Sequence, residues 1–402
     1  DRDRYELFYG ADISLLLSTN NLLWTVNIGN GKTEGTVQDK TPALEAPLSR
    51  PLFLWADSAS TRYVTDYDAN RIYVISGDKN ILTTFAGDGT SAYEKDGVPA
   101  TETSISCPIG IWVDNMNNLY FADNCNFRIR KVSIADSIIT TYAGTGSSEI
   151  FGDDGNATSA GLNNPYGLWG DPYGNIYFSE FSKCVIRKIS SSQIISLYVG
   201  SYSRCSYDVE IRGSSTPLNN PAGIYVSEYG EVFFADSGNN RIRYVVEAEG
   251  YRQVQLLAGN GYQGYSGDNN YPFSASLNEP RSVFCDGYGY VYLADTGNNV
   301  IRVVNPSGLN ISTLPRQLSY NERGGINGTL LNGPTGVFLN SNGEMYVVDT
   351  GNYHVRFVTV PSAPTQTPSS LPTSKPTAQP TNPSSCPTSQ PVRVKLTHLP
   401  LP

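Results

Sequence analysis

The chain has 402 residues, of which 39% are hydrophobic and 16% are charged, and its formal net charge is −9. Three of the 28 basic residues and none of the 37 acidic residues lie in residues 361–402, so the first 360 residues carry a net charge of −12. Nucleic-acid binding requires a basic surface that neutralises phosphates, and this acidic balance argues against it. The sequence also lacks a hydrophobic run near the ~20 residues of a membrane-spanning helix.

The first 21 residues contain two segments typical of strands, residues 5–9 (YELFY) and 13–17 (ISLLL). We predict that residues 1–21 form an N-terminal extension that supplies an additional edge strand or a strand exchanged with a neighbouring subunit. Because the chain begins at Asp1 without a Met or a signal peptide, we interpret it as a mature chain whose leader has been removed.

A repeat of 54 to 59 residues accounts for most of the chain. Its six copies begin at Pro51, Pro108, Pro165, Pro221, Pro280 and Pro334. In the second copy, hydrophobic segments separated by turns predict strands at residues 109–114, 119–123, 128–132 and 138–142. Four short strands in each of six copies predict an all-β fold, a six-bladed β-propeller of four-stranded blades.

The turn before the third strand carries a recognisable motif. It reads DSGNNRIR at 236–243, DTGNNVIR at 295–302 and DTGNYHVR at 349–356, and an Ala-Gly-x-Gly segment follows the fourth strand at 86–89 and 258–261. Over residues 22–360 these motifs resemble the NHL-repeat β-propellers. The first copy departs from the pattern at Tyr73, where other copies have Arg, and the third has Glu180 in place of Asp.

The last copy ends at its third strand, near Val360, so its fourth strand must come from another part of the chain. Residues 22–28 (LLWTVNI) precede Gly29-Asn-Gly31, the glycine pattern that follows the other fourth strands. We therefore predict that an N-terminal strand completes the sixth blade and closes the ring, which removes an exposed sheet edge.

Acidic and arginine side chains recur at equivalent positions of the copies. They are Asp123, Asp236, Asp295 and Asp349, with Arg130, Arg187, Arg243, Arg302 and Arg356. One interpretation is a ring of carboxylates that binds metal or performs catalysis. Because the residues belong to the repeat itself, we favour turn formation and Asp–Arg pairing within or between blades.

Three long loops contain acidic, glycine-rich segments, at residues 95–97 (KDG), 152–155 (GDDG) and 266–268 (SGD). Calcium binds clustered oxygen ligands on such loops, but none of the segments has a complete ligand spacing, and turns without metal are the favoured interpretation. We predict no cofactor, with calcium as the alternative.

The sequence offers few catalytic candidates. His354 lies in the sixth repeat turn and His398 near the C-terminus, and two such histidines do not supply the three protein ligands of a catalytic zinc. A nucleophile-elbow motif and a phosphate-binding loop are also missing from the sequence. We therefore assign no catalytic residue and no metal ligand and predict that the protein is not an enzyme. A carboxylate-only active site in the channel remains an alternative.

Four cysteines lie in loops and turns that open on one face of a propeller. The predicted disulfides are Cys107–Cys125 and Cys184–Cys205, with four free thiols as the alternative. Disulfides indicate an oxidising compartment. Cys285 lies in a first strand, where we predict a buried free thiol.

Three Asn-x-Ser/Thr sequences lie in long connections or beside the outer edge of the fifth blade, at Asn156, Asn310 and Asn327. We predict N-glycosylation at all three, because a glycan there would not interrupt a strand ladder. Together with the cysteine pattern, they predict a secreted protein.

After Val360 the composition changes abruptly to Pro, Thr and Ser, with Pro at four-residue intervals from residue 364 to 380 and again from 383 to 391. Residues 361–391 cannot form a core, and we predict an extended polyproline II segment of about 95 Å. Predicted O-glycosylation sites are Thr365, Thr373, Thr377, Thr381 and Thr388. The segment resembles the tetrapeptide tails of secreted algal and protist wall or surface glycoproteins; a flexible linker is the alternative. Residues 392–402 are unassigned.

Together, these features predict a secreted, non-enzymatic structural or adhesive glycoprotein, a subunit of a surface appendage, fibre or wall. Its expected partners are further copies of itself or other surface glycoproteins. One alternative is a module that binds carbohydrate or peptide on the loop face. Another is a lyase or hydrolase with a carboxylate or calcium site in the central channel. The fold alone does not distinguish among these functions.

Overall fold

The computed structural model describes residues 23–33, 37, 39–202, 205, 214–248, 251–314 and 330–359. The chain divides into two units, Asp1–Val360 and Pro361–Pro402, and all elements below belong to the first. The predicted N-terminal extension, the Pro/Thr/Ser segment with its five threonines, and residues 392–402 lie outside the described residues. Within these residues, no helix is long and hydrophobic enough to cross a membrane.

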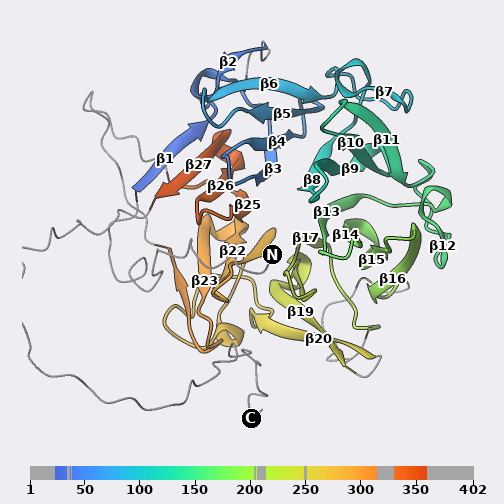
Figure 1. Cartoon of the computed structure of the whole chain (residues 1–402). Helices are drawn as coiled ribbons and strands as arrows, with labels where there is room; N and C mark the ends of the chain where they lie inside the picture. Colours follow the sequence, from blue (N-terminus) through green and yellow to red (C-terminus); the bar gives the residue numbers. More distant parts are fainter. Residues whose placement is uncertain are drawn as a thin grey trace, which may run out of the picture. The chain divides into compact units, whose positions relative to one another are not determined.

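Six antiparallel sheets surround a central axis (Figure 1). From the innermost strand outward, blade 1 contains β3 (Pro51–Ala56), β4 (Arg62–Asp66), β5 (Arg71–Ile75) and β6 (Ile81–Ala86); blade 2 contains β8 (Pro108–Val113), β9 (Asn118–Asp123), β10 (Arg128–Ser133) and β11 (Ile138–Ala143); blade 3 contains β13 (Pro165–Gly170), β14 (Ile176–Glu180), β15 (Val185–Ile189) and β16 (Ile194–Gly200). Blade 4 contains β17 (Pro221–Val226), β18 (Val232–Asp236), β19 (Arg241–Ala248) and β20 (Tyr251–Ala258); blade 5 contains β21 (Ser282–Cys285), β22 (Val291–Asp295), β23 (Val300–Val304) and β24 (Ile311–Thr313); blade 6 contains β25 (Pro334–Leu339), β26 (Met345–Asp349), β27 (His354–Thr359) and β1 (Leu23–Ile28). The predicted six-bladed, all-β fold is confirmed, and the strands of the second copy differ from their predicted bounds by at most one residue.

The N-terminal strand closes the ring, as predicted. β1 pairs antiparallel with β27, and Trp24 lies opposite Val358 in the ladder. Trp24 and Ile28 are buried in the hydrophobic core of the sixth blade. This arrangement joins the two ends of the propeller and pairs the edge of β27 that would otherwise be exposed.

Short outer strands, which the repeat pattern did not predict, cover the edges of three blades. β2 (Thr41–Pro42), β7 (Val98–Pro99) and β12 (Gly155–Asn156) pair with β6, β11 and β16. Each belongs to the loop that enters the blade it covers, and a short 3-10 helix follows it. These helices are η1 (Ala43–Glu45), η2 (Ala100–Glu102) and η4 (Ala157–Ser159), and η7 (Pro272–Ser274) is their equivalent before blade 5.

The strand directions define two faces of the propeller. The loops that enter the blades and the turns between second and third strands lie at one end, which we call the loop face, because Pro108 and Arg128 both pair with Asp123. Its turns form η3 (Asn124–Asn126), η5 (Phe181–Lys183), η6 (Ser237–Asn239), η8 (Thr296–Asn298) and η9 (Thr350–Asn352). The turns between first and second strands lie at the opposite end, which we call the turn face.

Candidate functional site

The recurring acidic and arginine residues form buried ion pairs inside the blades. The distances between carboxylate oxygen and arginine nitrogen are 3.2 Å for Asp123–Arg130, 3.6 Å for Glu180–Arg187, 2.7 Å for Asp236–Arg243, 3.5 Å for Asp295–Arg302 and 2.5 Å for Asp349–Arg356. The five acidic side chains are inaccessible to solvent. Each carboxylate also accepts a backbone N–H from the entering loop, as Asp123 does from Ser106 at 2.7 Å. The pair therefore fastens the entering loop to the second and third strands.

The acidic loops supply a second carboxylate to three of these arginines. Asp96 lies 2.7 Å from Arg130, and Asp153 lies 2.8 Å from Arg187. In blade 5, Asp268 lies 2.8 Å from Arg302. Each arginine therefore lies between two carboxylates. Their loops are the segments considered above for calcium, and in the described residues no group of three His, Cys, Asp or Glu side chains is placed to hold a metal ion.

Burial raises the pKa of several repeat carboxyls. The pKa of Glu180 rises to about 7 and that of Asp295 to about 6, in both cases mainly because burial disfavours the charged form. Asp66, whose blade has Tyr73 in the arginine position, also has a pKa of about 6. For Glu180, burial outweighs the attraction of Arg187, whose Nη1 atom lies 3.6 Å away.

These raised pKa values predict that the protein becomes less stable as the pH rises from 5 to 8. The folded pKa of Glu180 exceeds its ordinary value of 4.5, so the folded state binds a proton that the unfolded state releases. This contribution to stability is complete below pH 4.5 and is lost as the pH rises through about 7. We expect the free energy of unfolding, measured in denaturant at pH 5 and pH 8, to decrease less between these pH values for Glu180→Gln than for the wild type. An equal decrease in both proteins would contradict this prediction.

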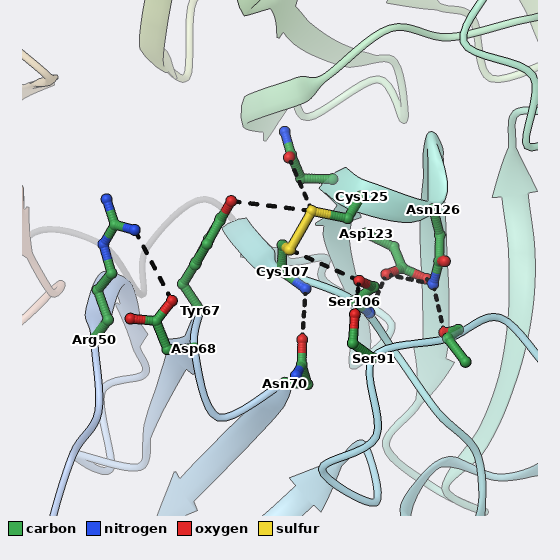
Figure 2. Close-up of a disulfide and its surroundings, with 12 residues drawn as sticks. Arg50, Tyr67, Asp68, Asn70, Ser91, Ser106, Cys107, Asp123, Cys125 and Asn126 are labelled. Atoms are coloured by element: carbon green, nitrogen blue, oxygen red, sulfur yellow. Dashed lines mark hydrogen bonds and ion pairs between the residues drawn. A yellow bond between two sulfur atoms is a disulfide. The ribbon is translucent and has the colours of Figure 1, made fainter. Parts of the chain in front are cut away.

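The two predicted disulfides are present. Cys107 and Cys125 join the entry of blade 2 to its own loop-face turn, and Cys184 and Cys205 join the corresponding turn of blade 3 to the next connection. Figure 2 shows that the first disulfide lies beside blade 1, where Asn70 accepts the Cys107 N–H at 3.0 Å and the Tyr67 hydroxyl lies 3.9 Å from the Cys125 sulfur. The disulfide thus anchors the loop face where two blades meet.

Removing the first disulfide should destabilise the propeller measurably. The bond joins residues 18 positions apart, and a disulfide that closes a loop of this size stabilises the folded state by about 3 kcal/mol. We expect Cys107→Ser/Cys125→Ser to lower the free energy of unfolding by that amount in denaturant titrations. Cys285→Ser is the control, because Cys285 forms no disulfide. A double variant as stable as the control would contradict this prediction.

The remaining predicted positions differ in their surroundings. Cys285 is free as predicted, but it is half-buried rather than buried, because it lies at the turn-face end of β21. Asn156 lies in the short strand β12 opposite Ile194, so it belongs to a ladder rather than to a plain connection. Its side chain is exposed, and its Oδ1 accepts hydrogen bonds from the N–H and hydroxyl of Thr158. Asn310 is half-buried next to β24, whereas Asn327 lies outside the described residues. Burial lowers the pKa of His354, which lies at the start of β27.

Aromatic side chains close the central axis near the turn face, a feature that the sequence analysis missed. Each innermost strand carries an aromatic residue at the equivalent position: Trp55, Trp112, Trp169, Tyr225, Phe284 and Phe338. Trp112 packs on Tyr120 of its own blade, and the other five belong to one hydrophobic cluster. We call these six residues the axial ring. Trp169 of blade 3 lies 6.0 Å from Phe338 of blade 6, directly across the propeller, and 6.0 Å from Phe284. Their spacing of one repeat was the available signal.

Backbone packing narrows the axis above this ring. An added Cβ on Gly167 would lie 2.4 Å from the Ala222 carbonyl oxygen, so only glycine allows the neighbouring innermost strands to approach this closely. Phe53 and Tyr166, from blades 1 and 3, are 6.0 Å apart toward the loop face. The channel expected to accommodate an active site is therefore occupied by protein atoms at several levels.

Six four-stranded blades, each organised by a buried carboxylate, define the class of protein as a six-bladed β-propeller. Comparison with known sequences shows which repeat proteins the chain is similar to. NHL repeat-containing protein 2 from Homo sapiens is 27% identical over 346 residues, which are 77% of this chain and 46% of that protein. This relative and the six-bladed fold support an NHL-repeat propeller, as the motifs predicted.

Other comparisons extend over similar lengths. Protein SUPPRESSOR OF QUENCHING 1, chloroplastic, from Arabidopsis thaliana is 26% identical over 340 residues, 80% of this chain and 31% of that protein. The chain thus spans less than half the length of both relatives. A gluconolactonase from Xanthomonas campestris superposes with a TM-score of 0.54 at 12% identity, covering 88% of this chain and 94% of that one, which shows a shared fold. No protein-family model matches the chain.

Proposed function

We propose that the protein is a secreted, non-enzymatic structural or adhesive glycoprotein, a subunit of a surface appendage, fibre or wall. The observation that carries this proposal is the closed axis. Propeller enzymes need a solvent-accessible group of reactive side chains, whereas Trp169 and Phe338 meet across the channel here. The repeat carboxylates are buried against arginines rather than directed into a cavity.

Two further features support an extracellular location. Both disulfides stabilise the loop face, and such bonds persist in oxidising compartments. Asn156 offers an exposed acceptor for N-glycosylation, and the threonines at 365, 373, 377, 381 and 388 are proposed sites of O-glycosylation. A Pro/Thr/Ser segment coated with sugars would act as an extended spacer.

The proposal can be tested on native material with an antibody against the propeller. Immunogold electron microscopy should label an extracellular fibre, wall or appendage, and mass spectrometry of the purified protein should detect glycan at Asn156. Labelling confined to the cytoplasm, together with an unmodified Asn156, would overturn the proposal. A purified sample with hydrolase or lyase activity that is lost on replacing a described carboxylate would favour the enzyme instead.

A further inference from the structure

The turn face presents a set of exposed apolar side chains at equivalent positions of four consecutive blades. Met116, Tyr173, Tyr229 and Tyr288 occupy the tips of the turns between first and second strands, and they are 81, 71, 79 and 45% exposed. Large apolar side chains exposed at one end of a soluble domain are typical of an interaction surface. Their recurrence in blades 2 to 5 makes a continuous arc rather than isolated positions.

This arc borders the axial ring. Trp112, Trp169 and Tyr225 lie four residues before the tips of their own blades and are half-buried, so solvent reaches them. We call these three residues, together with Met116, Tyr173, Tyr229 and Tyr288, the aromatic face. Each inner member lies near the end of an innermost strand, and the turn that follows this strand carries an outer member. The result is a broad aromatic platform at the closed end of the propeller.

Carboxylates hold the tips in place and make their surroundings acidic. The backbone N–H groups of Met116 and Tyr173 each donate to the aspartate two residues earlier, Asp114 or Asp171, at 2.9 Å. The six turns contain seven acidic residues: Asp57, Asp114, Asp171, Glu228, Glu231, Asp286 and Glu344. They contain no Lys or Arg. The rigid tips limit the conformational entropy lost on binding, and the charge selects basic ligands.

We propose that the aromatic face binds a basic, proline-rich segment in the polyproline II conformation, supplied by residues 361–395 of a second copy of this chain. Proline-rich segments dock on surfaces lined by aromatic side chains, because polyproline II is already formed and little entropy is lost. Residues 361–395 have this chemistry, with Pro mostly at four-residue intervals, three basic residues (Lys375, Arg393 and Lys395) and no acidic one.

The inference deepens the proposed structural role and rests on it, because binding of one copy's proline-rich segment by another copy's propeller would link subunits into an assembly. Each propeller offers one aromatic face, and each chain carries one proline-rich segment. This heterologous, head-to-tail contact extends a chain of subunits rather than closing a dimer.

The test uses the full-length protein and a fluorescent synthetic peptide with the sequence of residues 361–395, without glycan, in an anisotropy titration. We expect saturable binding that weakens with added salt. Tyr173→Ala/Tyr229→Ala should weaken it at least about tenfold, because exposed aromatic anchors contribute much of the affinity of such interfaces. The matched control is Tyr262→Ala, which removes a tyrosine of similar exposure, 77%, from a connection at the loop face.

Self-association provides the second measurement. In sedimentation velocity, the wild type should assemble with increasing concentration, the peptide should inhibit assembly, and the double variant should remain monomeric. Absence of peptide binding, or equal binding by the double variant, overturns the inference. So does binding of a neutral oligosaccharide, but not the peptide, in a way that depends on Tyr173 and Tyr229. If the protein forms native fibres but does not bind the peptide, the proposed function stands and the inference fails. If the protein is intracellular but binds the peptide, the proposed function fails and the binding surface stands.

Discussion

Replacing Ile28 with Ala is expected to lower the free energy of unfolding by about 2–5 kcal/mol, the usual cost of removing a large buried side chain. Ile28 is fully buried in β1, the strand that completes blade 6. Its loss weakens a contact that joins the two ends of the propeller, so the effect should extend beyond a local cavity. We expect a lower denaturation midpoint and faster hydrogen exchange in β27 before global unfolding.

Thr25→Ala is the matched control, because Thr25 lies in the same strand and its side chain is exposed. It should change stability by less than about 0.5 kcal/mol. If Ile28→Ala were no more harmful than Thr25→Ala, β1 would not close the ring in solution. Rapid exchange of β27 in the wild type would lead to the same conclusion.

Arg187→Met is the second change with a large expected effect, and it should lower the free energy of unfolding by about 3–5 kcal/mol. The variant leaves the buried Glu180 carboxyl without its arginine and also releases Asp153 on the entering loop, and removing one partner of a buried pair is strongly destabilising. Arg187 also donates to the Gly161 carbonyl at 2.9 Å, so the loop loses a second anchor. Unfolding in denaturant measures the loss.

A second substitution distinguishes charge from packing. Glu180→Gln/Arg187→Met should recover part of the stability, because no ionisable group then remains buried at the centre of the site. Arg50→Met is the control: Arg50 lies 3.9 Å from Asp68 on the surface, where ion pairs contribute little. Equal effects of Arg187→Met and Arg50→Met would show that the repeat arginines do not organise the blades.

Much of the fold was predictable because its signals are local. Strand alternation and turn residues lie within one repeat, which explains why β8 to β11 begin and end near their predicted bounds. The closure by β1 was also predictable, since Gly29-Asn-Gly31 repeats the pattern that follows other fourth strands. The disulfides followed from the propeller order, which places Cys107 and Cys125 at the same end of one blade.

Other features depend on contacts between distant parts of the chain. Calcium stayed an alternative for the acidic loop segments because the partners of their carboxylates, such as Arg130 for Asp96, lie more than thirty residues away in the sequence. β2, β7 and β12 are too short to carry a strand pattern. Whether the side chains at the turn-face tips are exposed also depends on the other blades, because these blades could cover them.

The sequence by itself determined the number of blades and the strand that closes the ring, because turn chemistry and the repeat period are local signals. It predicted the pairing of the cysteines but left free thiols as an alternative. Only the tertiary structure decided that the axis is closed and that the turn face is aromatic. The innermost aromatic residues are one repeat apart in sequence, but Trp169 and Phe338 meet only because ring closure brings opposite blades within 6.0 Å. Convergence on an axis is a property of all six blades together, and no single repeat encodes it.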